Sequence, residues 1–185
     1  MGTFVTLGNL RKPFPRILTA VAQAVEQLST PILIQHGHTP WPAAMPGHTT
    51  GVAFLDNDEF EHAVTASDVC IAHGGAGSIL TAHRAGVIPF VMPRRQRPGE
   101  HIDDHQHELV SQLAGRGLVH RFDDAAQLRK LLREHTPAPS ESLSAGAAIS
   151  TGTPRAIPQE RSAMVQTISD LLATIEEETD GPGTG

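Results

Sequence analysis

The chain has 185 residues, of which 39% are hydrophobic and 4% aromatic, and this length suits one globular domain with some additional tail. The net charge of -6 and the absence of tyrosine argue against a surface built to bind nucleic acid. A single cysteine excludes an intrachain disulfide, and no apolar run approaches the roughly 18 residues that span a bilayer, so we expect a cytoplasmic protein.

Short apolar runs alternate with segments of helical periodicity along residues 1–135. The runs predict strands over 3–7, 32–35, 51–54, 69–72, 89–92 and 118–121. The periodic segments predict helices over 14–28, 58–66, 77–85, 104–114 and 124–135. Apolar strands that alternate with helices are typical of a parallel sheet covered on both faces. We therefore predict an α/β, doubly wound domain that binds ligands at the carboxyl ends of its strands.

The remainder of the chain differs in composition. Residues 136–158 are rich in Ala, Pro, Ser, Gly and Thr without periodicity, which predicts a flexible linker. Residues 159–178 predict an amphipathic helix, and residues 179–185 a disordered tail. The apolar face of this helix fits docking either on its own domain or on a partner. The apolar face comprises Met164, Ile168, Leu171, Leu172 and Ile175.

The sequence AHGGAGSI, residues 72–79, joins a predicted buried strand to a helix. Glycines at such a junction let a ligand approach the backbone, and the free N–H groups at the helix start suit a diphosphate. These groups belong to Gly75, Ala76, Gly77 and Ser78. Ser78 either donates to a phosphate or only caps the helix, and His73 either donates to the diphosphate or fixes the loop. The spacing matches neither GxGxxG nor GxxxxGKS.

A second motif, PRRQRPGEHIDDHQHEL, follows the next predicted strand and so opens on the same edge of the sheet. Its residues Asp104, His105 and Gln106 lie at a predicted helix start, where they can hydrogen-bond sugar hydroxyls. An N-cap is the alternative role for Asp103 or Asp104. His101 and His105 lack a third ligand at metal spacing, so we predict no metal site.

The segments HGGAGSILTAHRAGVIPFVMPRR and GEHIDDHQHEL resemble the C-terminal, donor-binding domain of glycosyltransferase family 28. The similar part of the chain begins at FVTLGN and ends near residue 135. The resemblance also includes single-domain subunits of two-component glycosyltransferases, among them those of exopolysaccharide biosynthesis. It implies that residues 1–135 form a Rossmann-like nucleotide-sugar-binding domain, one half of the GT-B fold. It also implies a UDP-sugar substrate and no metal or other cofactor.

The resemblance implies a role for individual residues. Gly75 and Ser78 match the diphosphate loop, whereas Phe54 and Leu55 match the edge on which uracil rests. Several relatives have an acidic residue at the position of Thr81, where it accepts from the ribose hydroxyls, so a bidentate contact is lost here. The residues and the resemblance together predict a donor site that comprises Gly8, Asn9, Phe54, Leu55, His73, Gly74, Gly75, Ala76, Gly77, Ser78, Thr81, Arg94, Arg95, Asp104, His105 and Gln106.

Arg94 and Arg95 lie on the same predicted edge of the sheet. An arginine fork matches a carboxylate, so a hexuronic acid donor fits the pair as well as a hexose does. The alternative is a solvated basic loop, or one that faces a partner or anionic lipid.

The family resemblance implies the donor-binding catalytic subunit of an inverting glycosyltransferase. Its acceptor would be a lipid-linked saccharide. A membrane-anchored partner would supply the acceptor site and recruit the chain to the membrane. The residue that acts as the catalytic base is unknown, and the resemblance implies that it belongs to the partner. Two alternatives stay open: a non-catalytic nucleotide-sugar-binding or regulatory subunit, and an NAD-type dinucleotide-binding module.

Overall fold

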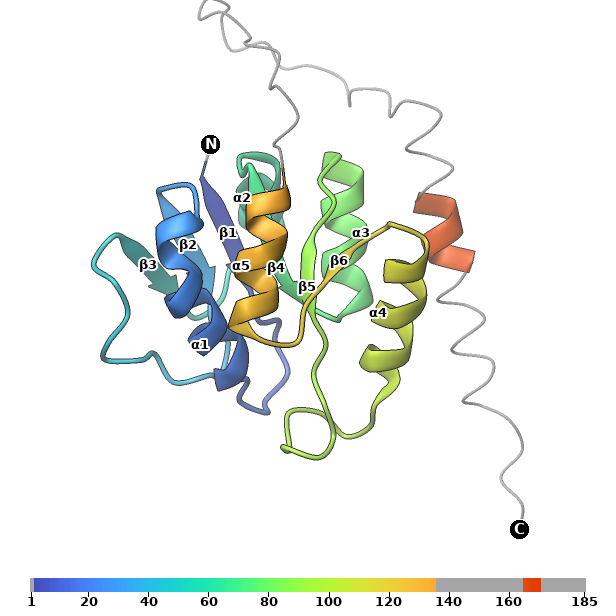
Figure 1. Cartoon of the computed structure of the whole chain (residues 1–185), viewed down its shortest axis with the longest axis horizontal. Coiled ribbons are helices and arrows are strands. Elements are labelled where there is room, and N and C mark those ends of the chain that lie inside the picture. The colour runs from blue at the N-terminus through green and yellow to red at the C-terminus, as the bar shows by residue number, and fades with distance from the viewer. Residues whose placement is uncertain (1, 136–164, 171–185) are drawn as a thin grey trace, which may run out of the picture.

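The computed structural model describes residues 2–135 and 165–170, and its centre is a parallel sheet of six strands in the order β3-β2-β1-β4-β5-β6 (Figure 1). The strands are β1 (Thr3–Thr6), β2 (Ile32–Gln35), β3 (Thr49–Val52), β4 (Val69–His73), β5 (Phe90–Met92) and β6 (His120–Arg121). The helices are α1 (Pro15–Ala24), α2 (Asn57–Thr65), α3 (Ala76–Ala85), α4 (His105–Gly115) and α5 (Ala125–Glu134), with a 3-10 turn η1 (Val25–Gln27) after α1. This architecture confirms the predicted doubly wound sheet.

Alternate residues of the strands enter different hydrophobic clusters, as the two-residue period of a strand requires. Val5 and Ile71 pack with the apolar faces of α1 and α5. Phe4 and Cys70 pack with residues of α2 and α3 on the opposite face. Burial raises the pKa of the Cys70 thiol to about 12, so the thiol stays protonated and unreactive at neutral pH.

Several predicted boundaries were wrong by a few residues. The strand expected over 51–54 is Thr49–Val52, because it pairs with Ile32–Gln35 over those four positions and residues 53–55 then leave the sheet. The helix expected over 14–28 ends at Ala24 and continues as the 3-10 turn. The last strand is shorter than expected, and only His120 and Arg121 pair with β5.

Residues 165–170 form a helical segment beside α4 (Figure 1). Its Ile168 is fully buried in a cluster with Leu109 and Leu113 of α4. This segment therefore packs on its own domain, one of the two alternatives for the predicted helix. The other apolar residues of that helix, the predicted linker 136–158 and the predicted tail 179–185 lie outside the described residues. Among the described helices, none is long and apolar enough to cross a membrane.

Candidate functional site

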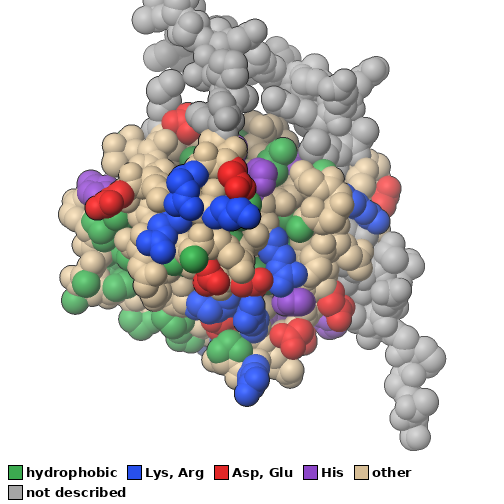
Figure 2. Space-filling model, in the orientation of Figure 1, with side chains coloured by type: hydrophobic (Ala, Val, Ile, Leu, Met, Phe, Trp, Pro, Cys, Tyr) green, Lys and Arg blue, Asp and Glu red, His purple; other side chains and the backbone are tan. Residues whose placement is uncertain are grey.

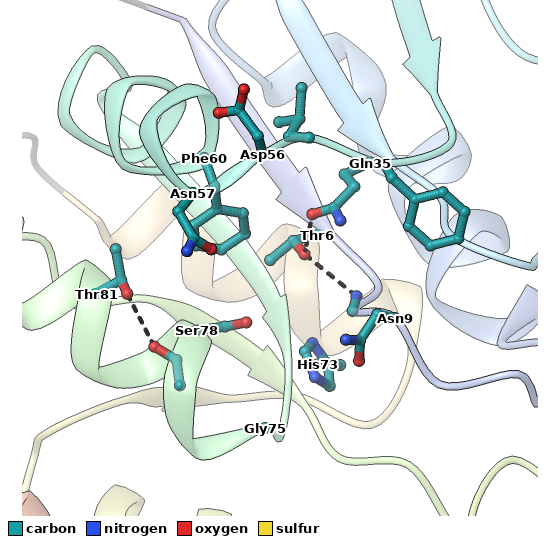
Figure 3. Close-up of a pocket in the computed structure, with 14 residues that line it drawn as sticks. Thr6, Asn9, Gln35, Asp56, Asn57, Phe60, His73, Gly75, Ser78 and Thr81 are labelled. Atoms are coloured by element: carbon teal, nitrogen blue, oxygen red, sulfur yellow. Dashed lines mark hydrogen bonds between the residues drawn. The ribbon is translucent and has the colours of Figure 1, made fainter.

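A pocket of ≈ 490 Å³ opens at the carboxyl ends of β1, β2 and β4 (Figure 3). The chain adds strands outward in one direction from β1 and in the other from β4, so the pocket lies at the switch point where parallel α/β sheets bind ligands. Its lining comprises Thr6, Gly8, Asn9, Gln35, Phe54, Leu55, Asp56, Asn57, Phe60, His73, Gly75, Gly77, Ser78 and Thr81. Nine of the residues implied by the resemblance are therefore brought together here.

The start of α3 forms one wall of the pocket. Gly75 is its N-cap and has no side chain to accept from the first-turn N–H groups. A Cβ on Gly77 would meet no protein atom within 4 Å, so the backbone there is open to a ligand. The Ser78 hydroxyl points into the same space (Figure 3). Unpaired N–H groups at the positive end of a helix dipole favour an anion at this wall.

His73 lies between the two glycine loops. A Cβ on Gly8 would come within 2.6 Å of the His73 ring, and one on Gly75 would overlap its Nε2, so both positions require glycine for this packing. Gly8 also has φ 73°, which favours glycine. Burial, with a smaller contribution from the charge of Arg94, lowers the pKa of His73 to about 4. At neutral pH the imidazole is uncharged, and its buried Nδ1 has no hydrogen-bond partner among the described residues.

The opposite wall is formed by the segment between β3 and α2. Phe54 is 48% exposed and lines the pocket together with Leu55, giving an apolar surface suited to a planar base. Asp56 caps α2 in a capping box: its Oδ1 accepts from Glu59 N at 2.8 Å, and Glu59 Oε2 accepts from Asp56 N at 2.9 Å. Asp56 is therefore the helix cap, and Asn57, the first residue of α2, lines the pocket.

The Thr81 hydroxyl is already engaged within its own helix. Its Oγ1 donates to the carbonyl of Gly77 at 3.0 Å, as Figure 3 shows. The remaining lone pairs of that oxygen can accept from a ligand hydroxyl, but Thr81 cannot make the two contacts of a carboxylate.

Arg94 does not line the pocket, contrary to its implied place in the donor site. It is 1% exposed, and its guanidinium donates to the carbonyls of Leu7 (2.7 Å), Lys12 (2.8 Å) and Glu100 (3.0 Å). Burial lowers the pKa of Arg94 to about 10, which leaves it charged at neutral pH. Since these bonds hold the β1–α1 loop against the loop after β5, the structure gives Arg94 a structural role instead of a contact with a sugar carboxylate.

Arg95 is engaged as well. Its Nη2 lies 2.6 Å from Asp123 Oδ1, and its backbone N–H donates to Glu100 Oε2 at 3.0 Å. Glu100 also forms a two-point ion pair with Arg16, at 2.7 and 3.0 Å. The arginine pair therefore gives no support for a hexuronic acid over a neutral hexose.

The start of α4 adjoins the glycine loop without lining the pocket itself. A Cβ on Gly74 would lie 3.0 Å from Gln106 Cβ, and Gln106 Oε1 accepts from Arg94 N at 3.2 Å. The His105 side chain is 47% exposed beside Asp103. Asp104 makes no side-chain cap: its Oδ1 accepts from Gln96 N at 2.9 Å. Ala76, the remaining residue implied by the resemblance, also lies outside the lining.

The sequence reasoning missed five lining residues: Thr6, Gln35, Asp56, Asn57 and Phe60. Thr6 and Gln35 are the polar residues that end β1 and β2 after apolar neighbours, and this position is a signal that the sequence carried. Within residues 2–135 and 165–170, no group of three His, Cys, Asp or Glu side chains is placed to hold a metal ion.

The sheet order and the glycine loop define a Rossmann-like α/β domain. Residues 10–158 match the model of the glycosyltransferase family 28 C-terminal domain, and the chain belongs to that family. No curated protein sequence matches it.

Three solved glycosyltransferases share this fold. The glycotransferase of kitacinnamycin has 18% identity and a TM-score of 0.53, over 95% of this chain and 38% of its own. The calicheamicin glycosyltransferase CalG4 has 17% identity and a TM-score of 0.56, over 94% and 38%. SnogD from Streptomyces nogalater has 20% identity and a TM-score of 0.51, over 94% and 43%. The chain thus spans 38–43% of the length of these GT-B enzymes.

Proposed function

We propose that this chain binds a UDP-sugar in the pocket and is the donor-binding catalytic subunit of an inverting, metal-independent glycosyltransferase. The observation that carries the proposal is one pocket with unpaired N–H groups at one wall and an exposed aromatic ring at the other. The first wall suits a diphosphate and the second a pyrimidine. Membership of family 28 supports the same assignment.

In this proposal the start of α3 stabilises the leaving diphosphate. Preorganised N–H donors act on negative charge as it develops, so they lower the barrier without a metal ion. Gly8 and Asn9 contact the same phosphates from the β1–α1 loop, and the neutral His73 donates to them. His105 and Gln106 bind the sugar hydroxyls beside Gly74. Because Arg94 and Arg95 are engaged elsewhere, they do not favour a hexuronic acid, and the donor sugar can be a hexose or a hexuronic acid.

We propose that the acceptor site and the general base belong to a second subunit. The similar enzymes are more than twice as long as the part that this chain matches. The family resemblance implies a second domain that closes on the donor. We further propose that this partner is membrane-anchored, that it recruits the chain from the cytoplasm, and that the acceptor is a lipid-linked saccharide. The base would deprotonate an acceptor hydroxyl, which attacks the anomeric carbon as UDP leaves.

Calorimetry and transfer assays test the proposal together. We expect UDP to bind the purified chain and raise its melting temperature, whereas NAD does neither, since a ligand stabilises the state to which it binds. Sugar transfer to a lipid-linked acceptor should appear when membranes that contain the partner are added. Stabilisation by NAD in place of UDP would assign the pocket to a dinucleotide. UDP binding without transfer by the reconstituted pair would favour a non-catalytic subunit.

A further inference from the structure

The floor of the pocket carries a relay of two hydrogen bonds. Gly8 N–H donates to Thr6 Oγ1 at 3.2 Å, and Thr6 Oγ1 donates to Gln35 Oε1 at 3.0 Å (Figure 3). A hydroxyl has one proton and two lone pairs, so Thr6 accepts from Gly8 and uses its proton for Gln35. In the structure the carbonyl end of the Gln35 amide therefore faces Thr6.

The other end of this amide is a donor. Gln35 is 6% exposed and lines the pocket, and its Nε2 lies on the side away from Thr6 (Figure 3). No acceptor in the described part of the chain pairs with Nε2. A nearly buried amide that is held in one orientation and directs free N–H groups at a pocket is suited to an acceptor on a ligand, because a buried polar group left unpaired is costly.

From this geometry, and resting on the proposed function, we propose that Gln35 is a further nucleotide-binding residue. Its Nε2 donates to an acceptor oxygen of the bound nucleotide, either a carbonyl of the base or an oxygen of the phosphates. Thr6 is a positioning residue that keeps the amide in the donor orientation. Gly8 connects this relay to the loop that faces the phosphates.

The first test is UDP binding by two variants with different chemistry at this position. Gln35→Glu keeps an oxygen for Thr6 and loses the donor, whereas Gln35→Met loses the donor without adding charge. Each should weaken UDP binding at least about tenfold, or about 1.4 kcal/mol. Gln23→Glu, on the exposed surface of α1, makes the same change of charge away from the pocket and should bind UDP as the unaltered chain does.

Thr6 is tested by a variant that breaks the relay and one that keeps it. Thr6→Val should weaken UDP binding about as much as Gln35→Met, and Thr6→Ser, which retains the hydroxyl, should restore it. A purely structural role would lower the melting temperature without this rescue of affinity. In addition, the side-chain amide signals of Gln35 in an NMR spectrum, identified by their loss in Gln35→Glu, should shift when UDP is added.

Uridine distinguishes the two acceptors. If the base carbonyl accepts, the Gln35 variants lose uridine and UDP binding alike; if a phosphate accepts, uridine binding is unchanged and UDP binding falls, and both results support the inference. Equal UDP affinity for the unaltered chain, Gln35→Glu and Gln35→Met would overturn it and leave the proposed function standing. Failure of the unaltered chain to bind UDP would instead overturn the proposed function, and this inference with it.

Discussion

Two loop regions at the same edge of the sheet use their polar residues in opposite ways. Around the ends of β1, β2 and β4, several donors have no protein partner and glycines leave the backbone open. The loop after β5 is rich in charge, but its charged groups are engaged within the protein: Glu100 pairs with Arg16, and Arg94 donates to backbone carbonyls. Figure 2 shows acidic and basic side chains close together at this lower edge. Unsatisfied hydrogen-bonding capacity, and not charge, therefore indicates the ligand site.

The largest expected effect comes from removing the hydrogen bonds of Arg94 in the loop after β5. Arg94→Met leaves three backbone carbonyls without their donor, and we expect it to lower the free energy of unfolding by about 4 kcal/mol. Urea unfolding measures this change. Arg97→Met, an exposed arginine in the same loop, should change stability by less than about 0.5 kcal/mol. Equal stability of the two variants would contradict the structural role of Arg94.

Blocking the open region should affect binding and spare the fold. A Cβ on Gly77 meets no protein atom within 4 Å and enters the pocket wall, so Gly77→Val should weaken UDP binding by more than about 100-fold, or about 3 kcal/mol. Gly115→Val, at another unobstructed helical glycine, is the control and should leave binding intact. Unchanged calorimetric affinity in Gly77→Val would remove α3 from the site.

The same difference explains which features could be predicted from the sequence and which could not. Residue type revealed the strands, the helices and the glycine loop, because these follow from periodicity and local backbone demands. It failed for Arg94, whose partners Leu7 and Lys12 are more than eighty positions away and are brought near by folding. The hydrogen bond between Thr6 and Gln35 was hidden for the same reason, since it joins two neighbouring strands.

His73 makes the open region sensitive to acid. Its pKa is about 4 in the fold and 6.5 in the unfolded chain, so both states are neutral above pH 6.5 and the unfolded state alone gains a proton as the pH falls toward 4. We expect the protein to lose about 2–3 kcal/mol of stability over this interval beyond any loss in His73→Asn. Unfolding free energies measured from pH 7 to 4 test this, and parallel curves for the two proteins would contradict it.

Ser78 should contribute less than the backbone around it. Its hydroxyl points into the pocket, and removing one hydrogen bond to a charged phosphate costs about 1–2 kcal/mol, so Ser78→Ala should weaken UDP binding by that amount. Calorimetry measures the change. Ser67→Ala removes a hydroxyl that donates to Ala63 O outside the pocket and should leave UDP affinity unchanged. Equal UDP affinities for the two variants would show that the Ser78 hydroxyl does not contact the phosphates.

The smallest effect is expected at Arg95, where the two regions are most easily confused from sequence. Its ion pair with Asp123 joins side chains that are 40% and 24% exposed, and such pairs contribute under about 1 kcal/mol. Arg95→Ala should therefore change stability little. Because its guanidinium faces Asp123 and not the pocket, the ratio of UDP-glucuronate to UDP-glucose turnover by the reconstituted enzyme should also stay the same. A fall in that ratio, with UDP affinity constant, would show that Arg95 leaves Asp123 to contact the sugar and would return hexuronic acids to the candidate donors.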